Sequence, residues 1–133
     1  MECDTICLAV GLSPMTELAW LAGCEFTYIP AFGGHVPMHS EDMETTAPGI
    51  YVAGDITGAE EASTAMEEGK LAGVSAAASL GFLTRGEAEE CRDGIRRRMA
   101  ALRSGPFGER RAAAKQSQLD AYAAYMKNGG KRE

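Results

Sequence analysis

A short apolar segment that ends in a glycine and a carboxylate is the part of the sequence best suited to chemistry. Residues 46–55 read TAPGIYVAGD, a turn and an apolar run followed by Gly54 and Asp55. Ligands of α/β sheets bind where strands end. Glycine lets the backbone approach a ligand closely, and the Asp55 carboxylate can accept hydrogen bonds from polyol hydroxyls. The alternative is that Asp55 is only a turn or helix-capping residue.

A second candidate for ligand binding is the beginning of the helix that should follow this segment. The alanine-rich stretch at 59–80, ended by Gly81, predicts a long helix. Glu61 and Ala62 lie at its start, where unpaired backbone N–H groups and the positive end of the helix dipole favour negative charge. We interpret the acids at positions 60 and 61 as helix-start charges rather than as general bases.

The histidines and cysteines are weaker candidates. His35 and His39 have no third metal ligand at a convincing spacing. On an extended segment they would also lie about 13 Å apart. The four cysteines fit neither a disulfide framework nor a zinc motif, and we expect reduced thiols. The sequence contains no C-x-x-C motif and therefore no redox-active disulfide of that type.

The first half of the chain alternates between strand and helix patterns. Continuous apolar runs at 4–10 and 50–53 predict buried strands of the parallel type. A short helix is expected at 15–23, and extended segments at 26–29 and 34–38 flank a Gly-Gly turn. The sequence at 40–49 predicts a loop.

The long helix at 59–80 carries small residues at a spacing of four. Gly69, Gly73 and Ala77 share one helix face. Each interior glycine costs roughly 1 kcal/mol relative to alanine. We therefore expect this face to approach a sheet or another helix closely, the alternative being a flexible surface helix.

Two amphipathic helices are predicted in the last third of the chain. Thr84 and Glu87 have the spacing of a capping box and should begin a helix that ends near Arg103. A final helix is expected at 109–127, before two glycines. Both helices must pack on another surface. Their sizeable apolar residues are Ile95, Met99, Leu102, Leu119, Tyr122 and Met126.

Charge divides the chain into an acidic body and a basic tail. Residues 1–84 hold twelve acids and one base, whereas residues 85–133 hold seven acids and twelve bases. The acidic body is a poor partner for nucleic acid. The tail could contact RNA or an acidic protein, or it could fold back on the acidic body. We expect a cytoplasmic protein, because the sequence has no membrane-spanning apolar run and no signal-peptide pattern.

Three blocks of sequence resemble the pyridine-nucleotide-disulfide oxidoreductase superfamily. DTICLAVGLSP (4–14) resembles the last strand of its NAD(P)H domain, and METTAPGIYVAGD (43–55) resembles its late FAD fingerprint. EEASTAMEEG (60–69) is similar to the start of the helix that follows. The resemblance covers roughly residues 4–81. It is greatest to the FAD/NAD(P)-binding subunits of amine and imino-acid dehydrogenases, such as the sarcosine oxidase alpha and hydrogen cyanide synthase types.

The resemblance implies a fold and a set of cofactor contacts. The fold class is α/β: a partial Rossmann-like FAD-binding domain of short parallel-type strands and a long helix, followed by an α-helical tail. Residues 1–14 would be the last NAD(P)H-domain strand and crossover, 15–81 the C-terminal half of the FAD domain, and 82–133 the tail. Asp55 would accept a hydrogen bond from the ribityl chain of FAD beside Gly54. The backbone at Glu61 and Ala62 would face the pyrimidine edge of the flavin.

The sequence also lacks parts that this family needs. No G-x-G-x-x-G motif is present, and most of the NAD(P)H domain is missing. We therefore expect another protein subunit to carry the glycine-rich FAD fingerprint and the NAD(P)H domain, or the chain to self-associate. Two functions remain open. One is an FAD-binding component of a flavin-dependent, NAD(P)-linked oxidoreductase acting on amines or imino and amino acids. The other is a non-catalytic assembly or regulatory module, or a remnant of such a flavoprotein.

Overall fold

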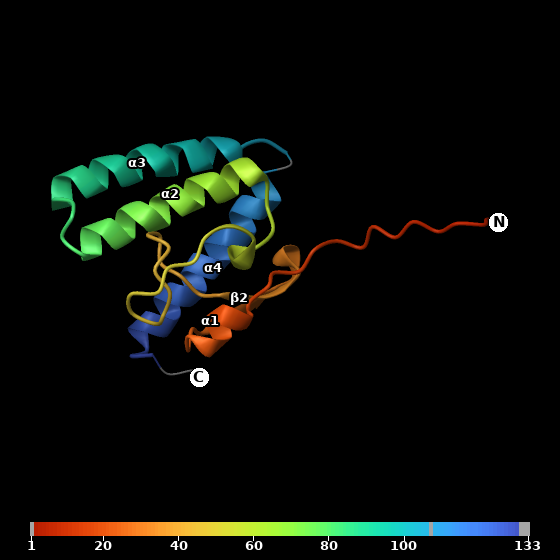
Figure 1. Ribbon diagram of the computed structural model, residues 1–133, viewed down its shortest axis with the longest axis horizontal. Coiled ribbons are helices and arrows are strands. Elements are labelled where there is room, and N and C mark those ends of the chain that lie inside the picture. The colour runs from red at the N-terminus through yellow and green to blue at the C-terminus, as the bar shows by residue number, and fades with distance from the viewer. Residues whose placement is uncertain (1, 107, 131–133) are drawn as a thin grey trace.

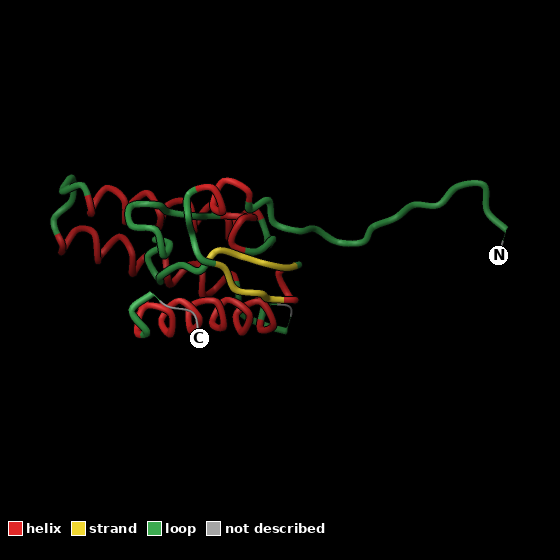
Figure 2. Tube along the Cα trace, turned by 90° about the horizontal axis from the view of Figure 1, so that it is seen from below, coloured by secondary structure: helices red, strands yellow, loops and turns green. Residues whose placement is uncertain are grey.

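Three long helices form most of the body of the protein. The computed structural model describes residues 2–106 and 108–130. Helix α2 (Ala62–Ser79) and helix α3 (Arg85–Leu102) lie side by side and run in opposite directions, joined by a short turn (Figure 1). Helix α4 (Glu109–Lys127) crosses the body on its other side, next to a small β-hairpin (Figure 2).

The two tail helices form where the sequence places them. The hydroxyl of Thr84 accepts a hydrogen bond from the backbone N–H of Glu87, and the Glu87 carboxylate accepts one from the Thr84 backbone. This capping box fixes the start of α3. The bounds of α4 agree with the predicted 109–127. Local capping and breaker residues therefore define both helices.

A β-hairpin is the only sheet in the part of the chain that the structure describes. Strand β1 (Phe26–Ile29) pairs in antiparallel register with strand β2 (Gly34–Pro37) through the short 3-10 helix η1 (Pro30–Phe32). Gly33 ends η1 with a φ of 81°, a conformation that favours glycine. The extended segments predicted around the Gly-Gly turn are confirmed. The predicted helix before them is shorter, as α1 (Glu17–Leu21).

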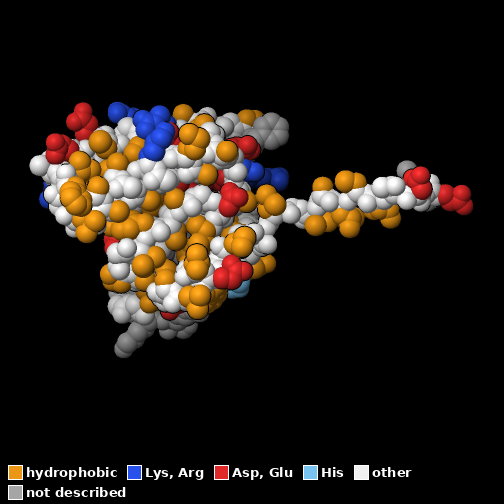
Figure 3. Space-filling view, viewed as in Figure 1, with side chains coloured by type: hydrophobic (Ala, Val, Ile, Leu, Met, Phe, Trp, Pro, Cys, Tyr) orange, Lys and Arg blue, Asp and Glu red, His pale blue; other side chains and the backbone are white. Residues whose placement is uncertain are grey.

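The prediction of two buried parallel strands is wrong for this structure. Residues 2–13 are exposed and form an extended arm without strand pairing, and Figure 3 shows hydrophobic side chains along it. At 50–53 the chain makes only an isolated antiparallel bridge, between Glu44 and Tyr51, although Val52 is buried. A buried parallel strand needs hydrogen-bonded neighbours, and the described residues supply none. A parallel Rossmann-like sheet is therefore absent from residues 2–106 and 108–130.

The apolar core is divided into three small clusters. One joins α2 and α3 through Met43, Leu71 and Ile95. Another joins the hairpin region to α4, and a third lies around α1 and β1. Those two clusters consist of Ile29, Phe32, Val36 and Ala114, and of Ala19, Cys24 and Phe26.

The small-residue face of α2 does not pack as predicted. Gly69 and Gly73 are exposed, and a Cβ atom built on either would meet no neighbouring atom within 4 Å. Helix α2 instead contacts α3 through the side that carries Leu71. The close approach expected for Gly69 and Gly73 is therefore wrong for the described chain, because the sheet that would cover this face is not there.

Candidate functional site

Gly54 and Asp55 begin a 3-10 turn, η2 (Gly54–Thr57), that follows the apolar segment 50–53. Gly54 has a φ of 77°, which a residue with a side chain adopts only with strain. Its backbone N–H donates a hydrogen bond of 2.9 Å to the Glu68 carboxylate. Asp55 itself is exposed. The turn thus places a solvent-accessible carboxylate next to a backbone anchored to α2.

The start of α2 lies against this turn and is open at its positive end. Ala62 is the first helical residue, and Glu61 is the N-cap residue without a side-chain capping hydrogen bond. Both residues are exposed, and the first turn of α2 contains no acidic residue. A Cβ atom built on Gly54 would lie 3.5 Å from that of Ala65, so η2 and α2 are in contact. The structure therefore brings the four predicted residues onto two adjoining surface elements.

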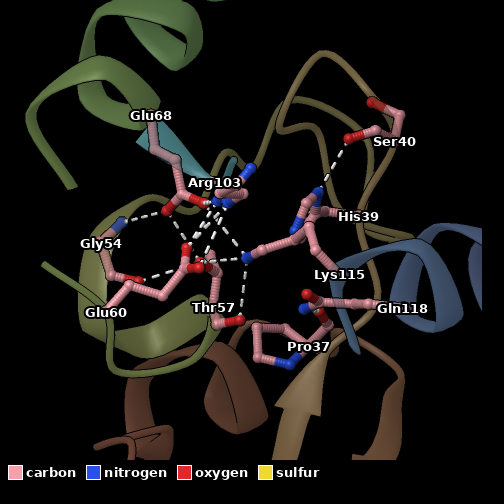
Figure 4. A network of polar contacts seen from close by, with 10 residues as sticks. All are labelled: Pro37, His39, Ser40, Gly54, Thr57, Glu60, Glu68, Arg103, Lys115 and Gln118. Atoms are coloured by element: carbon pink, nitrogen blue, oxygen red, sulfur yellow. Dashed lines mark hydrogen bonds and ion pairs between the residues drawn. The ribbon is translucent and has the colours of Figure 1, made fainter. Parts of the chain in front are cut away.

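A buried polar network lies directly beneath these elements (Figure 4). Its central residue is Glu68, whose side chain is 2% exposed. One carboxylate oxygen accepts hydrogen bonds from the Gly54 N–H at 2.9 Å and from the Thr57 hydroxyl at 2.8 Å. The other oxygen lies 2.7 Å from Arg103 Nη2 and 3.1 Å from Lys115 Nζ. Glu68 therefore joins η2 and α2 to the end of α3 and to α4.

The two cations of the network have further partners. Arg103 also binds Glu60, with Nη2 at 2.6 Å from a carboxylate oxygen. Lys115 donates to the backbone carbonyl of Thr57 at 3.1 Å and lies 2.9 Å from its hydroxyl. Buried charges are stable when they are paired and hydrogen-bonded. The conformation of η2 thus depends on residues from both tail helices.

The pKa shifts in this network follow from burial and from the neighbouring charges. Burial acts to raise the pKa of Glu68, but the charge of Lys115 and the Thr57 hydrogen bond together hold it below its usual value. Burial lowers the pKa of Lys115, although Glu68 opposes that shift. Burial also acts to lower the pKa of Arg103, but its bonds to Glu60 raise it above the ordinary value. Glu68 and Arg103 are held in their charged forms.

His39 is a buried neutral histidine beside the network. Its Nδ1 lies 2.8 Å from the Ser40 backbone oxygen, which can only accept, so Nδ1 carries the proton and Nε2 is an acceptor. Burial and the nearby charge of Lys115 lower the pKa of His39 to about 4. His35 instead lies exposed on β2 beside Tyr28. The two histidines therefore have different environments.

The sequence indicated this network only through its charge division. The expectation that the basic tail folds back on the acidic body is confirmed by the Arg103 and Lys115 contacts to Glu68 and by a 2.6 Å ion pair between Arg96 and Asp42. The individual pairings could not be predicted, because Glu68 has the sequence context of an ordinary surface helix residue. Within the described ranges, no helix is long and apolar enough to cross a membrane.

Comparison with known proteins identifies the source of the 46–55 motif and the α2 start. The profile of a family described as pyridine nucleotide-disulphide oxidoreductase matches residues 1–69, which is more than half of the chain. The chain belongs to this family. The resemblance inferred from the three sequence blocks is thereby confirmed.

Two relatives in this oxidoreductase family are named as opine oxidase subunits. The protein from Agrobacterium tumefaciens (strain Ach5) is 38% identical over 76 residues, which are 57% of this chain and 15% of the relative. The one from Rhizobium meliloti (strain 1021) is 35% identical over 71 residues, 53% of this chain and 16% of the relative. The chain thus matches only about one sixth of their length. No solved structure matches it.

The family match covers all four predicted site residues but not the tail. Gly54, Asp55, Glu61, Ala62 and also Glu68 lie within residues 1–69. The two cations that bind Glu68 lie beyond the match, near the end of α3 and in α4. In this oxidoreductase-family chain, a tail outside the matched segment therefore stabilises the turn that carries Asp55.

Proposed function

We propose that this chain is the FAD-binding component of a flavin-dependent, NAD(P)-linked oxidoreductase. It supplies the C-terminal half of the flavin site, and another polypeptide or segment supplies the glycine-rich fingerprint and the NAD(P)H domain. Membership of the oxidoreductase family supports a flavin-related role. The names of the two relatives, which denote one subunit of an oxidase, support assembly with a partner.

The observation that carries this proposal is the exposed Asp55 carboxylate beside the open start of α2. Asp55 is exposed, and the N-cap residue Glu61 makes no side-chain capping bond. An acceptor for a polyol and a positive helix end are thus both accessible on adjoining elements. FAD has complementary groups, because its ribityl chain carries hydroxyls and its pyrimidine ring gains negative charge on reduction.

Each residue would have a separate task in holding FAD. The carboxylate of Asp55 accepts a ribityl hydroxyl, and Gly54 keeps the backbone close to the flavin chain. The N–H groups at Glu61 and Ala62 stabilise negative charge at the pyrimidine edge. The cofactor supplies hydride transfer, and this chain supplies binding and electrostatic stabilisation.

The substrate class follows from the same resemblance and is part of the proposal. Amines and imino or amino acids are the substrates of the oxidoreductases that the sequence resembles most. The names of the two relatives make opines the first compounds to test. Substrate contacts are expected on the partner, because the site residues assigned to this chain all face the cofactor.

A non-catalytic module is the alternative function, and the structure removes one argument for it. The bases of the tail would favour such a module if they were free to bind another macromolecule. Arg103 and Lys115 are instead buried against Glu68 and have no free surface to offer. The exposed groups of the chain lie at Asp55 and at the α2 start, which favours the cofactor-binding role.

The test is flavin retention by the assembled complex. The chain is co-expressed with the neighbouring gene product that carries a G-x-G-x-x-G fingerprint, and the purified complex is expected to contain one FAD per site. Asp55→Asn should weaken FAD binding roughly ten- to hundred-fold, because a hydrogen bond to a charged group contributes about 1.5–3 kcal/mol. Flavin fluorescence during dilution gives the dissociation constant.

The matched control is Asp120→Asn, which makes the same chemical change on α4, outside the family match. This variant should retain FAD like the unmodified complex. Equal FAD affinity in the Asp55→Asn and control complexes would contradict the assignment of Asp55. A complex that assembles without any flavin would contradict the proposed function as a whole.

A further inference from the structure

A cavity of about 350 Å³ lies between α3, α4 and the loop after β2. This is within the size range of pockets that bind small molecules. Its apolar walls include Met43, Met99 and Leu119. Methionine side chains adapt to ligands of different shape. The polar wall includes His39 and Arg96, and Figure 4 shows His39 next to Lys115 at the edge of the buried network.

Two polar atoms of residues lining this cavity lack hydrogen-bond partners within the described chain. His39 is 1% exposed, and its Nε2 is buried without a donor. Because Nδ1 donates to Ser40, Nε2 is an acceptor that needs a donor. The Nε of Arg96 is buried without an acceptor. An unsatisfied buried group is costly, and such groups are uncommon in folded proteins.

The cations that line the cavity are already neutralised by the protein. Arg96 lies 2.6 Å from Asp42 and 3.1 Å from Glu89. Arg103 and Lys115 both bind Glu68. An anionic ligand would therefore meet little net positive charge, and it could not donate the proton that His39 Nε2 requires. The unmet requirements are one donor and one acceptor, not a negative charge.

We propose that this cavity binds a small, uncharged and largely apolar molecule through a hydroxyl group that donates to His39 Nε2 and accepts from Arg96 Nε. The apolar part of the ligand contacts Met43, Met99 and Leu119. None of Gly54, Asp55, Glu61 and Ala62 lines the cavity. The site is therefore separate from the proposed flavin contacts and goes beyond the proposed function.

The experiment measures binding of three probes of similar size to the full chain by NMR titration. Phenol carries the required hydroxyl, toluene has a methyl group in its place, and benzoate carries a negative charge that only accepts. Phenol should bind at least about five-fold more tightly than either of the others, because it alone satisfies both atoms. The imidazole ¹⁵N signal of His39 Nε2 should move on phenol addition.

Arg96→Lys tests the donor without removing the charge. Lysine keeps a positive charge for Asp42 but has no Nε–H at that position, so phenol affinity should fall about five-fold. The matched control is Arg98→Lys on the same helix, since Arg98 pairs with Glu67 and does not line the cavity. This control should leave phenol affinity unchanged.

His39→Phe tests the acceptor and should make phenol and toluene bind equally. If that variant fails to fold, the Arg96→Lys pair and the His39 signal still decide the question. Equal binding of phenol and toluene to the unmodified chain would overturn the proposal, as would tighter binding of benzoate. Absence of binding by all three probes would show that the two buried atoms are hydrated only, and would also overturn it.

Discussion

The buried network and the N-terminal arm differ in how their groups are satisfied. At Glu68, four partners from η2, α3 and α4 surround one carboxylate. In the arm, Ile6, Leu8, Val10 and Leu12 are between 75% and 90% exposed, and Figure 3 shows the arm projecting from the body. The network combines the most polar residues with the deepest burial, whereas the arm combines apolar residues with almost complete exposure.

This difference separates what the chain stabilises by itself from what it leaves for a partner. The tail helices provide the charges that make burial of Glu68 possible, so the body is closed by its own residues. The arm has large side chains at alternating positions and open backbone edges, which is the pattern of a strand without its sheet. We infer that the body folds without a partner and that the arm is the part of the chain that requires one.

Removing the central charge should have the largest effect on the network. Glu68→Gln leaves Lys115 buried next to a neutral amide, and loss of one member of a buried ion pair typically costs about 3–5 kcal/mol. The free energy of unfolding, measured by urea denaturation, should fall by about that amount. The turn that carries Asp55 should also become more mobile, because the Gly54 hydrogen bond is weakened.

The adjacent Glu67 provides the control for that substitution. Glu67 pairs with Lys70 and Arg98, whose side chains are about half exposed and can turn to water. Glu67→Gln should therefore destabilise the protein much less than Glu68→Gln. Similar losses for the two variants would show that the buried network contributes no more than an ordinary surface ion pair.

Local signals made the helices and the hairpin predictable. The capping box at Thr84 and Glu87 fixed the start of α3, and the Gly-Gly turn after η1 indicated the hairpin. The candidate turn at Gly54 and Asp55 and the α2 start at Glu61 were also placed near each other by the sequence. In each case a few neighbouring residues determine the backbone conformation, so no distant contact is needed for the prediction.

Burial and charge pairing were not predictable in the same way. The apolar runs at 4–10 and 50–53 have strand composition, but a strand becomes part of a sheet only when neighbours are present. Glu68 and Lys115 are 47 positions apart and have no local pattern in common. Their contact depends on how α2 and α4 pack. The sequence could therefore predict attraction between body and tail but not the residues that form it.

Lowering the pH should weaken the body through His39. The folded protein keeps its pKa at about 4, whereas the ordinary value is 6.5, so the unfolded chain binds a proton first as the pH falls. Stability that is present above pH 6.5 is lost progressively down to pH 4. Between pH 7.5 and 5 the unfolding free energy should fall by about 2 kcal/mol from this group.

The pH dependence can be assigned to one histidine by substitution. His39→Gln removes the titrating group and should flatten the stability curve between pH 7.5 and 5, even if the variant is less stable throughout. His35→Gln should leave the slope unchanged, since His35 is exposed. The pKa of Glu68 lies below its ordinary 4.5, so its protonation weakens the fold only at lower pH. An unchanged slope in His39→Gln would contradict the buried neutral state.

The smallest effect on stability is expected in the arm, where the effect on association should be largest. Val10 is 90% exposed, so Val10→Lys should change the unfolding free energy by less than about 0.5 kcal/mol. The unmodified chain without a partner should be colourless and self-associate through the arm, and Val10→Lys should shift it toward monomer in sedimentation velocity. Thr5→Lys adds the same charge at another exposed position of the arm without removing a large apolar side chain, so it should retain more of the association. If the unmodified chain sediments as a stable monomer, the arm does not require a partner sheet, and the contrast with the closed network disappears.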